Sequence, residues 1–502
     1  MINSQSCIMT KWLIPVICLV IGLILVESCN MKSNEALARQ HCSSCHAFPE
    51  PSLLPKSIWL QSVLPQMAFR MGLDKSNLYT INPMDRKAVL STLPETPMVN
   101  YKEWVKILKY YRDNAPDSIV FDASEIKDTL RQFHPMTVAF QDKADRFVTM
   151  VNYDSQNKKA FIGTRNGSIF ELKPSLKLQK MMDAKNPVSQ LLSIADKKLV
   201  LTMGIMNPND HALGKLLSFQ HNTIQQVLLD SLKRPVHFNV MDLNQDQLDD
   251  VVVCEFGDYT GELSAFKNMG NETFEKNGIL KMPGARKTEF VDWDANGTTD
   301  FVALVSQGDE KLILVKNKGN FNFEIETLLR FPSVYGSSYF ELQDMNQDGA
   351  VDIIYTNGDN ADYSIVLKPY HGIRIFLNDG KGKFNESWFY PNPGASQVRV
   401  RDFDGDGDQD IASISFFPDF NHYPERGFIY FENNKGIFKP SVTPMGGMGR
   451  WITMEACDYD SDGDDDILLG ALNFTLSLPV TLQEKWKENP VDILVLENQT
   501  KK

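Results

Sequence analysis

The sequence has few cysteines and few positive charges for its length. Seven cysteines among 502 residues exclude a small scaffold held together by disulfides. Lysine and arginine number 51 against 64 aspartates and glutamates, a net charge of -13. This excludes nucleic acid as a partner, because phosphate binding needs a basic surface. The sequence also lacks a glycine-rich phosphate loop and a recognisable nucleophile–base pair. The motifs therefore assign no catalytic residue.

Long apolar runs are equally rare, and the clearest one lies at the N-terminus. Lys11 precedes the apolar stretch 12–26, which ends shortly before Cys29. A basic flank followed by a run of this length is typical of a secretory signal and is short for a membrane span. We interpret residues 1–28 as a bacterial lipoprotein signal peptide and Cys29 as the lipidated residue. A cleaved signal without lipid and an uncleaved anchor are the alternatives. All three place the rest of the chain outside the cytoplasm. We expect a lipid-anchored protein of the bacterial cell envelope, in the periplasm or at the cell surface.

The remaining composition is that of a folded protein with more than one domain. Hydrophobic residues make up 42% and charged residues 23% of a chain too long for one ordinary core. The pattern of apolar residues is typical of helices over 33–115 and of short strands from about residue 130 onward. Cys254 and Cys457 lie in two of these strands and are expected to be buried free thiols.

Cys42, Cys45 and His46 form the motif Cys-x-x-Cys-His, the attachment sequence of c-type haem. The two thiols form thioether bonds with the haem, and the adjacent histidine is carried under the iron as its proximal ligand. A zinc site would need a second cysteine or histidine pair, which the sequence does not offer. The motif therefore predicts covalently bound haem c, and residues 33–115 resemble a compact helical cytochrome c domain.

The sixth iron ligand is expected to be a methionine, for which there are three alternatives. Met67 follows Trp59 with a spacing similar to that of short cytochrome domains, and we favour it. Met98 directly precedes a predicted amphipathic helix over 101–114, the position that the ligand has in ordinary small cytochromes. Met71 lies close to Met67 and is the third alternative.

Five nine-residue segments repeat in the second half of the chain, with starts at 242, 292, 344, 402 and 458. Each has side-chain oxygens at positions 1, 3, 5 and 9, namely Asp242, Asn244, Asp246 and Asp250; Asp292, Asp294, Asn296 and Asp300; Asp344, Asn346, Asp348 and Asp352; Asp402, Asp404, Asp406 and Asp410; and Asp458, Asp460, Asp462 and Asp466.

Closely spaced oxygen ligands suit Ca²⁺, which takes six to eight of them, and glycine at position 6 permits the sharp turn. Only the first segment lacks that glycine, having Gln247 instead. An EF-hand would need glutamate at position 12 and a following helix, whereas apolar strands follow here. The segments carry three carboxylates in each of the first three and four in each of the last two, which would repel one another without cations. We predict up to five Ca²⁺ sites.

These segments, with the strand and the Asn-Gly-Phe turn that follow them, resemble the FG-GAP or VCBS repeats of the β-propellers also found in integrin α subunits. The turn is seen at 376–384 and 431–438. The resemblance implies that each acidic loop joins the first two strands of a blade. It predicts a mainly β fold over 130–502, a seven-bladed β-propeller preceded by the small all-α cytochrome c domain. Two blades without acidic loops would fill roughly 130–232; six or eight blades are alternatives.

Polar and aromatic residues are concentrated in the loops expected on the opposite face of the propeller, at 255–259, 357–363, 368–372 and 416–423. His237, Arg286, Arg450 and Trp451 are expected at the same end. We predict an extracytoplasmic electron-transfer lipoprotein whose calcium-binding propeller docks a redox partner or a ligand. The alternatives are a sugar or alcohol oxidoreductase that uses the haem as electron acceptor, and a glycan-binding or adhesion module.

Overall fold

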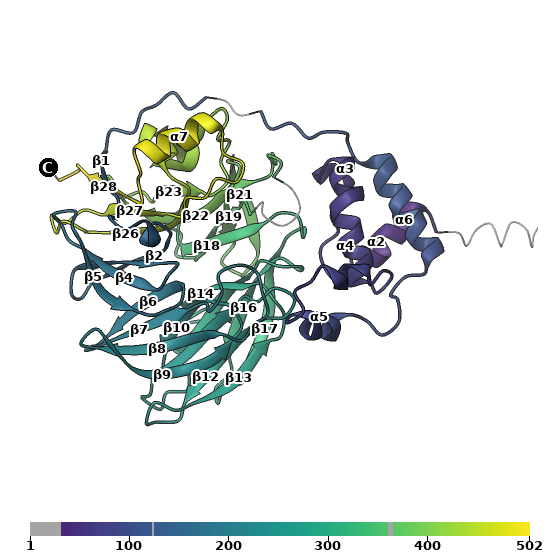
Figure 1. Ribbon diagram of the computed structural model, residues 1–502, viewed down its shortest axis with the longest axis horizontal. Helices are drawn as coiled ribbons and strands as arrows, with labels where there is room; N and C mark the ends of the chain where they lie inside the picture. Colours follow the sequence, from purple (N-terminus) through teal and green to yellow (C-terminus); the bar gives the residue numbers. More distant parts are fainter. Residues whose placement is uncertain (1–31, 123–124, 360–364, 502) are drawn as a thin grey trace, which may run out of the picture.

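The computed structural model describes residues 32–122, 125–359 and 365–501. A helical region and an all-β region lie side by side, and the segment that joins them runs across the edge of the β region (Figure 1). The predicted signal peptide and Cys29 lie outside the described residues. Among the residues that are described, no helix has the length and apolar character needed to cross a membrane.

The helical region consists of α2 (Asn34–Cys42), α3 (Lys56–Ile58), α4 (Leu64–Arg70), α5 (Arg86–Thr92) and α6 (Tyr101–Asn114). Single turns of other helix types occur at η1 (Pro51–Leu53), η2 (Trp59–Val63) and η3 (Ser76–Tyr79). The helix predicted over 101–114 is confirmed. It begins where the Asn100 side chain accepts a hydrogen bond from the Glu103 N–H at 2.9 Å, a standard N-cap.

The core of this region lies between α2, η2 and α6. The Trp59 and Tyr111 rings are 4.5 Å apart, centroid to centroid. Trp59 is buried, and its indole N–H donates to the Pro51 carbonyl at 2.9 Å, so its polar atom is satisfied. Helix α2, whose last residue is Cys42, packs directly on α6, and its residues Leu37 and Ala38 belong to the same buried core.

The all-β region has seven four-stranded antiparallel sheets. Their strands are β2 (Val148–Asp154), β3 (Lys159–Thr164), β4 (Ser168–Leu172) and β5 (Leu178–Asp183); β6 (Val188–Ile194), β7 (Lys197–Thr202), β8 (Gly214–Gln220) and β9 (Thr223–Leu232); β10 (Pro235–Met241), β11 (Asp250–Glu255), β12 (Glu262–Asn268) and β13 (Phe274–Leu280); β14 (Ala285–Val291), β15 (Asp300–Val305), β16 (Lys311–Asn317) and β17 (Phe323–Arg330); β18 (Ser337–Gln343), β19 (Asp352–Asn357), β20 (Gly372–Asn378) and β21 (Phe384–Pro391); β22 (Ala395–Arg401), β23 (Asp410–Ser415), β24 (Phe428–Asn434) and β25 (Ile437–Val442); and β26 (Trp451–Cys457), β27 (Asp466–Ala471), β28 (Ile493–Asn498) and β1 (Phe133–Val138).

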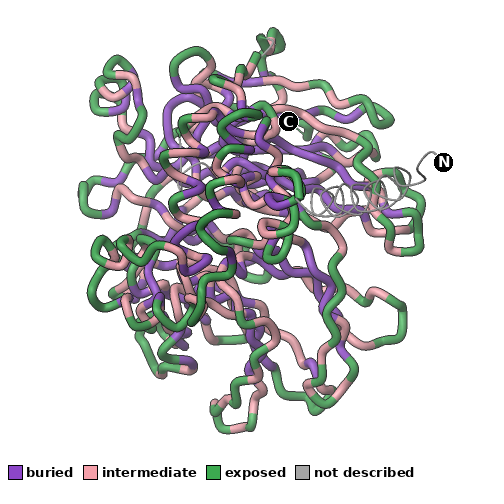
Figure 2. Tube along the Cα trace, turned by 90° about the vertical axis from the view of Figure 1, so that its right-hand side faces the viewer, coloured by how far each residue is buried: buried purple, intermediate pink, exposed green. Residues whose placement is uncertain are grey.

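The prediction of a seven-bladed propeller is confirmed. The second strand of each of the last five blades is buried along its whole length, because neighbouring blades cover both of its faces. Buried stretches accordingly follow the inner strands, while the turns are exposed (Figure 2). Cys254 and Cys457 lie in this interior as buried free thiols, as expected.

One part of the blade assignment differs from the prediction. The first blade begins at β2, and residues 133–138 form β1, the outer strand of the last blade, paired with β28 from Phe133↔Asn498 to Val138↔Ile493. The last blade thus combines strands from both ends of the propeller sequence, which closes the ring of blades. Helix α7 (Val480–Glu488) lies in the connection between β27 and β28.

Candidate functional site

The Cys-x-x-Cys-His motif lies where α2 ends against the propeller. Cys42 is the last residue of the helix, and Cys45 and His46 follow in the next turn. The side chain of His46 is buried, and its Nδ1 lies 2.9 Å from the Ala47 carbonyl oxygen. A carbonyl can only accept, so Nδ1 carries the hydrogen and Nε2 keeps its lone pair for a metal. Burial lowers the pKa of His46, which favours the neutral, metal-binding form.

A cavity of about 1420 Å³ lies between the helical region and the propeller. Cys42, Cys45 and His46 line it, together with Met67, Met71 and Met98. Apolar side chains such as Leu54, Trp59 and Val63 complete the helical wall. Two thiols, a correctly oriented imidazole, thioethers and apolar walls fit the requirements of haem c. The structure brings all three methionines to the cavity, so the choice of Met67 stays a prediction.

The propeller wall of the same cavity is polar. Its lining includes His237, Arg286, Asp258, Tyr259, Asp359 and Lys368, which the sequence placed at this end of the propeller. The volume exceeds the roughly 300–1,000 Å³ of a typical single-ligand pocket. A haem on the helical side would therefore leave room for a second molecule on the propeller side.

Several residues expected at this face are not part of the cavity lining. Arg450 is buried among the rings of Phe416, Phe417, Phe420 and Phe474, and it donates to the Phe416 carbonyl at 3.0 Å. Trp451 is buried and donates to the Gly446 carbonyl at 2.7 Å. Both residues therefore support the fold. Asn360, Asp362 and Tyr363 lie outside the described residues.

A group of charged residues on the innermost strands was missed by the sequence interpretation. It consists of Lys287, Glu289, Glu341, Arg399 and Glu455, and we call it the axial charge cluster. Arg399 lies 3.1 Å from Glu341 and 3.7 Å from Glu455, and Lys287 pairs with Glu289 and donates to the Phe340 carbonyl at 2.6 Å. Burial raises the pKa of Glu289 and of Glu455.

The neighbouring His237 remains neutral at ordinary pH. Burial, and then the positive charges of Lys287 and Arg399, lower the pKa of His237 to about 3. The polar surface of the innermost strands could have been predicted from the sequence. In all five blades with an acidic loop, the residues three and five positions before the first aspartate of the loop are polar, for example Glu289 and Lys287 before Asp292. In a strand, positions two apart share a face.

The helical region is held on the propeller by a small number of specific contacts. The guanidinium of Arg70 lies 4.0 Å from the Tyr259 ring centroid, and Phe69 packs edge-on against the same ring at 6.4 Å. Asp210 fixes the Tyr259 turn by accepting three backbone N–H groups, those of residues 258–260, at 2.8 to 3.1 Å. Asp85 of the helical region lies 3.0 Å from Nε2 of His211 and accepts the Asp210 N–H at 3.2 Å.

Substitution of Tyr259 by alanine is expected to loosen this interface without unfolding either region. The half-buried ring loses its contacts with Phe69 and Arg70, a loss of about 1–3 kcal/mol for the aromatic pair and the cation–π pair together. Hydrogen exchange of the α4 amides should accelerate in the variant, while the propeller strands keep their protection. Tyr79→Ala is the matched control, because Tyr79 is 83% exposed in the same region. Unchanged exchange in α4 would contradict the assigned role of Tyr259.

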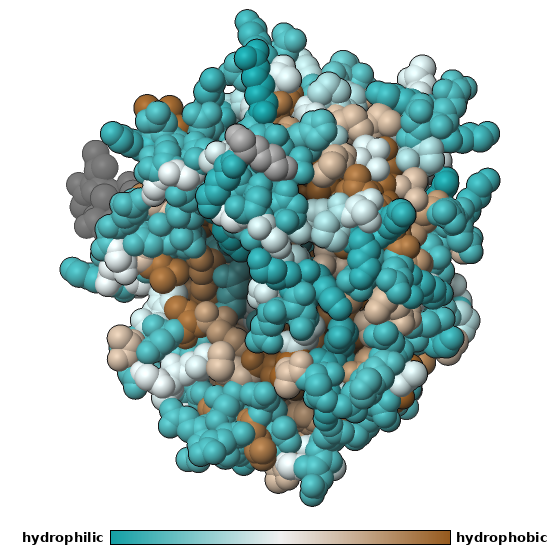
Figure 3. All heavy atoms as spheres, turned by 90° about the vertical axis from the view of Figure 1, so that its left-hand side faces the viewer, coloured by the Kyte–Doolittle hydropathy of each residue, from teal (hydrophilic) through white to brown (hydrophobic). Residues whose placement is uncertain are grey.

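All five acidic loops join the first two strands of their blades, on the propeller face away from the helical region. That face carries mainly hydrophilic side chains (Figure 3). In each loop the aspartate at position 1 accepts backbone N–H groups of the turn, for example those of Asp348 and Gly349 on Asp344 at 3.1 and 2.8 Å. The residue at position 6 has a positive φ in every loop, and Gln247, at 70°, takes the conformation that glycine has in the other four.

The aspartate at position 9 is buried and ties the loop to the third strand. Asp410 accepts the backbone N–H groups of Asn433 and Phe403 at 2.8 and 3.1 Å, and Asp466 does the same with Asn498 and Tyr459. The Asn433 side chain also donates to the Gln409 carbonyl at 3.0 Å and accepts the Gly436 N–H at 2.8 Å, which explains why an asparagine stands at this place in the third strand. Burial raises the pKa of Asp410 to about 6 and that of Asp466 to about 7, and the neighbouring carboxylates of Asp404 and Asp460, respectively, add to the rise.

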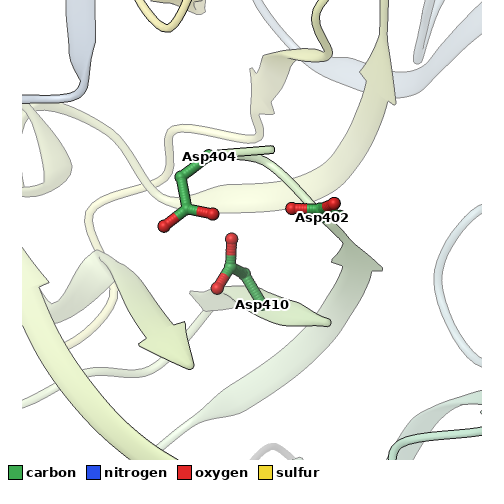
Figure 4. Close-up of side chains that lie close together, drawn as sticks. All are labelled: Asp402, Asp404 and Asp410. Carbon is green, nitrogen blue, oxygen red and sulfur yellow. The ribbon is translucent and has the colours of Figure 1, made fainter. Parts of the chain in front are cut away.

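The last two loops bring carboxylates closest together. One oxygen from each of Asp402, Asp404 and Asp410 lies within 4.8 Å of the others, and Asp458, Asp460 and Asp462 form a second such group. In the first group the three side chains converge on a common point (Figure 4). This geometry suits one hard cation per loop.

Comparison with known proteins found one family model and several solved structures that are similar to parts of this chain. A family model for the FG-GAP-like repeat matches residues 356–413, which include the acidic loop that begins at Asp402. The chain is similar to the WD40 domain of Pan2 from Neurospora crassa, with 10% identity over 74% of this chain and 98% of that domain and a TM-score of 0.44. It is also similar to the WD40 β-propeller domain of Doa1, with 11% identity over 72% and 95% and a TM-score of 0.42. A search of curated proteins returned no match.

Proposed function

We propose that this protein is an extracytoplasmic electron-transfer lipoprotein that binds haem c through Cys42, Cys45 and His46 and uses its propeller to dock a ligand or a partner. One observation carries the proposal: both motif cysteines, the oriented histidine and three methionines border a single cavity. When bound there, haem c would supply one-electron redox chemistry.

The residues of the helical region have separate roles in this proposal. The thiols of Cys42 and Cys45 attach the group, and the turn between them fixes its position relative to α2. His46 presents Nε2 because its Nδ1–H is held by the Ala47 carbonyl. The apolar wall around Trp59 keeps water away, which favours the reduced, less charged state.

The remaining parts of the proposal concern the anchor and the acidic loops. Lipidation of Cys29 would tether the chain to a membrane of the bacterial cell envelope, where haem is attached after export. Up to five Ca²⁺ ions at the acidic loops would neutralise clustered carboxylates and stiffen the blades that carry the cavity wall. The redox partner would dock on the exposed surface of the helical region or on the propeller.

The first test is a visible spectrum of the full-length protein, exported from cells that have the cytochrome c maturation apparatus. We expect a sharp α band on reduction and a weak near-infrared band from methionine ligation in the oxidised state. The Met67→Ala protein should lose the near-infrared band but keep its haem, whereas Met98→Ala should keep both. A protein without haem absorption would refute the electron-transfer proposal.

A second function, oxidation of a sugar or alcohol with the haem as electron acceptor, is favoured by the polar propeller wall. His237 lines the same cavity as His46, and in this function its neutral ring would hydrogen-bond the hydroxyl group of the substrate. Reduction of the oxidised haem by an added sugar or alcohol, lost in the His237→Ala protein, would support this function. A haem that stays oxidised with a broad panel of both would leave electron transfer between proteins as the function.

A further inference from the structure

An ion cluster on the fourth blade lies directly against the haem-attachment motif. It consists of Asp309, Lys311 and Arg330, and we call it the blade-4 ion cluster. Nε of Arg330 lies 2.6 Å from one carboxylate oxygen of Asp309, and Nζ of Lys311 lies 2.8 Å from the other. Arg330 also donates through Nη2 to the carbonyl oxygen of Cys45 at 3.4 Å. The propeller thus contacts the residue immediately before His46.

The surrounding chain strengthens this contact. Ala47, just after the motif, pairs with Pro332 in a parallel β-bridge, and Val334 is part of the hydrophobic core of the helical region. Asp309 lines the same cavity as His46, and its side chain is only 12% exposed. The blade-4 ion cluster is therefore held beside the motif by backbone as well as by side chains.

The charges of this cluster are held in place and are partly shielded from water. Burial raises the pKa of Asp309, but the hydrogen bonds and positive charges of Arg330 and Lys311 outweigh it, and the net pKa is lowered. Asp309 is thus ionised at neutral pH. Arg330 reaches the backbone of Cys45, and Asp309 borders the same cavity as His46, so both charges lie beside the haem-attachment motif.

We propose that Asp309 and Arg330 are positioning residues through which the propeller sets the reduction potential of the haem held by His46. This inference rests on the proposed haem function. A fixed negative charge near the iron stabilises the oxidised state and a fixed positive charge stabilises the reduced state, because the two states differ by one unit of charge. The interface of the two regions is then part of the redox centre itself, and the propeller is more than a docking surface.

The two charges predict shifts of opposite direction. Asp309→Asn should raise the midpoint potential, since Lys311 and Arg330 are left uncompensated. Arg330→Gln should lower the midpoint potential, because it removes a positive charge. Arg330→Lys keeps that charge, so its midpoint potential should stay close to that of the wild-type protein. We expect at least a threefold change in the reduction equilibrium constant for each charge-removing variant, where a tenfold change equals 59 mV for one electron.

The experiment is a spectroelectrochemical titration of the full-length haem-loaded protein and its variants. Glu324→Gln and Lys318→Gln are matched controls, since these residues form an ion pair of 3.0 Å at the other end of the same β16–β17 hairpin. Seven residues of strand separate the two ends, roughly 20 Å, which is beyond the screening length of about 10 Å at 0.1 M salt. The control potentials should equal that of the wild-type protein.

The outcomes separate this inference from the proposed function. Opposite shifts for Asp309→Asn and Arg330→Gln, with unchanged controls, support the inference. Unchanged potentials, or shifts of both variants in the same direction as expected for general loosening of the interface, overturn it while haem binding stands. A wild-type protein without haem absorption would instead refute the proposed function on which the inference depends.

Discussion

Exported protein in which Cys42 and Cys45 are both replaced by alanine is expected to be colourless and to lack the mass of a haem. Among the cysteines that the structure describes, only these two line the cavity, and they stand on either side of one turn at the end of α2. Without thioether bonds the haem would be held by axial ligands and apolar contacts alone. The cytochrome c maturation apparatus would also find no thiols to which it could attach the haem. We expect the loss to be complete in denaturing gels stained for haem.

The matched control is the Cys254→Ala/Cys457→Ala protein. These two thiols are buried in blade strands, and burial raises the pKa of both, so they are unreactive. The control should keep a full complement of haem, with at most a small loss of stability from the missing sulfur atoms. Haem retained after denaturation of the Cys42→Ala/Cys45→Ala protein, or lost from the control, would refute the assignment of the attachment site.

Removal of calcium with a chelator is expected to lower the melting temperature of the propeller by on the order of 10 °C. A site filled at a hundred times its dissociation constant contributes about 2.7 kcal/mol, and two such sites contribute about 5 kcal/mol. For large domains about 1 kcal/mol corresponds to roughly 2 °C. The loops beginning at Asp402 and Asp458 should account for most of this effect, since their carboxylates lie closest together. Differential scanning calorimetry with and without calcium measures it.

A pair of variants in a single loop tests the same prediction more closely. Asp404→Asn removes one of the three converging carboxylates and should reduce the calcium-dependent shift. Asp408→Asn lies in the same loop, where Asp408 accepts the Lys435 N–H at 2.8 Å, a bond that an asparagine oxygen can also accept. It should retain the full shift. A melting temperature that does not respond to the chelator in the wild-type protein would refute calcium binding.

Most of what the sequence predicted depends on residues that are close together in the chain. The seven-blade count followed from the spacing of the acidic loops, and the helix over 101–114 from its apolar period and its N-cap residue. The haem-attachment motif spans five residues and each acidic loop spans nine, so their chemistry is encoded by neighbours whose distance the backbone itself limits.

Only the tertiary structure shows which residues that are far apart in the sequence come into contact. Residues 133–138 close the ring by pairing with the C-terminal strand β28, so that one blade holds strands from both ends of the propeller sequence. The axial charge cluster exists only once four innermost strands, β14, β18, β22 and β26, lie around a common axis. Arg330 reaches the Cys45 carbonyl across 285 residues of sequence. Such contacts depend on how rigid sheets pack against each other, and that packing is a property of the whole core, which no local pattern specifies.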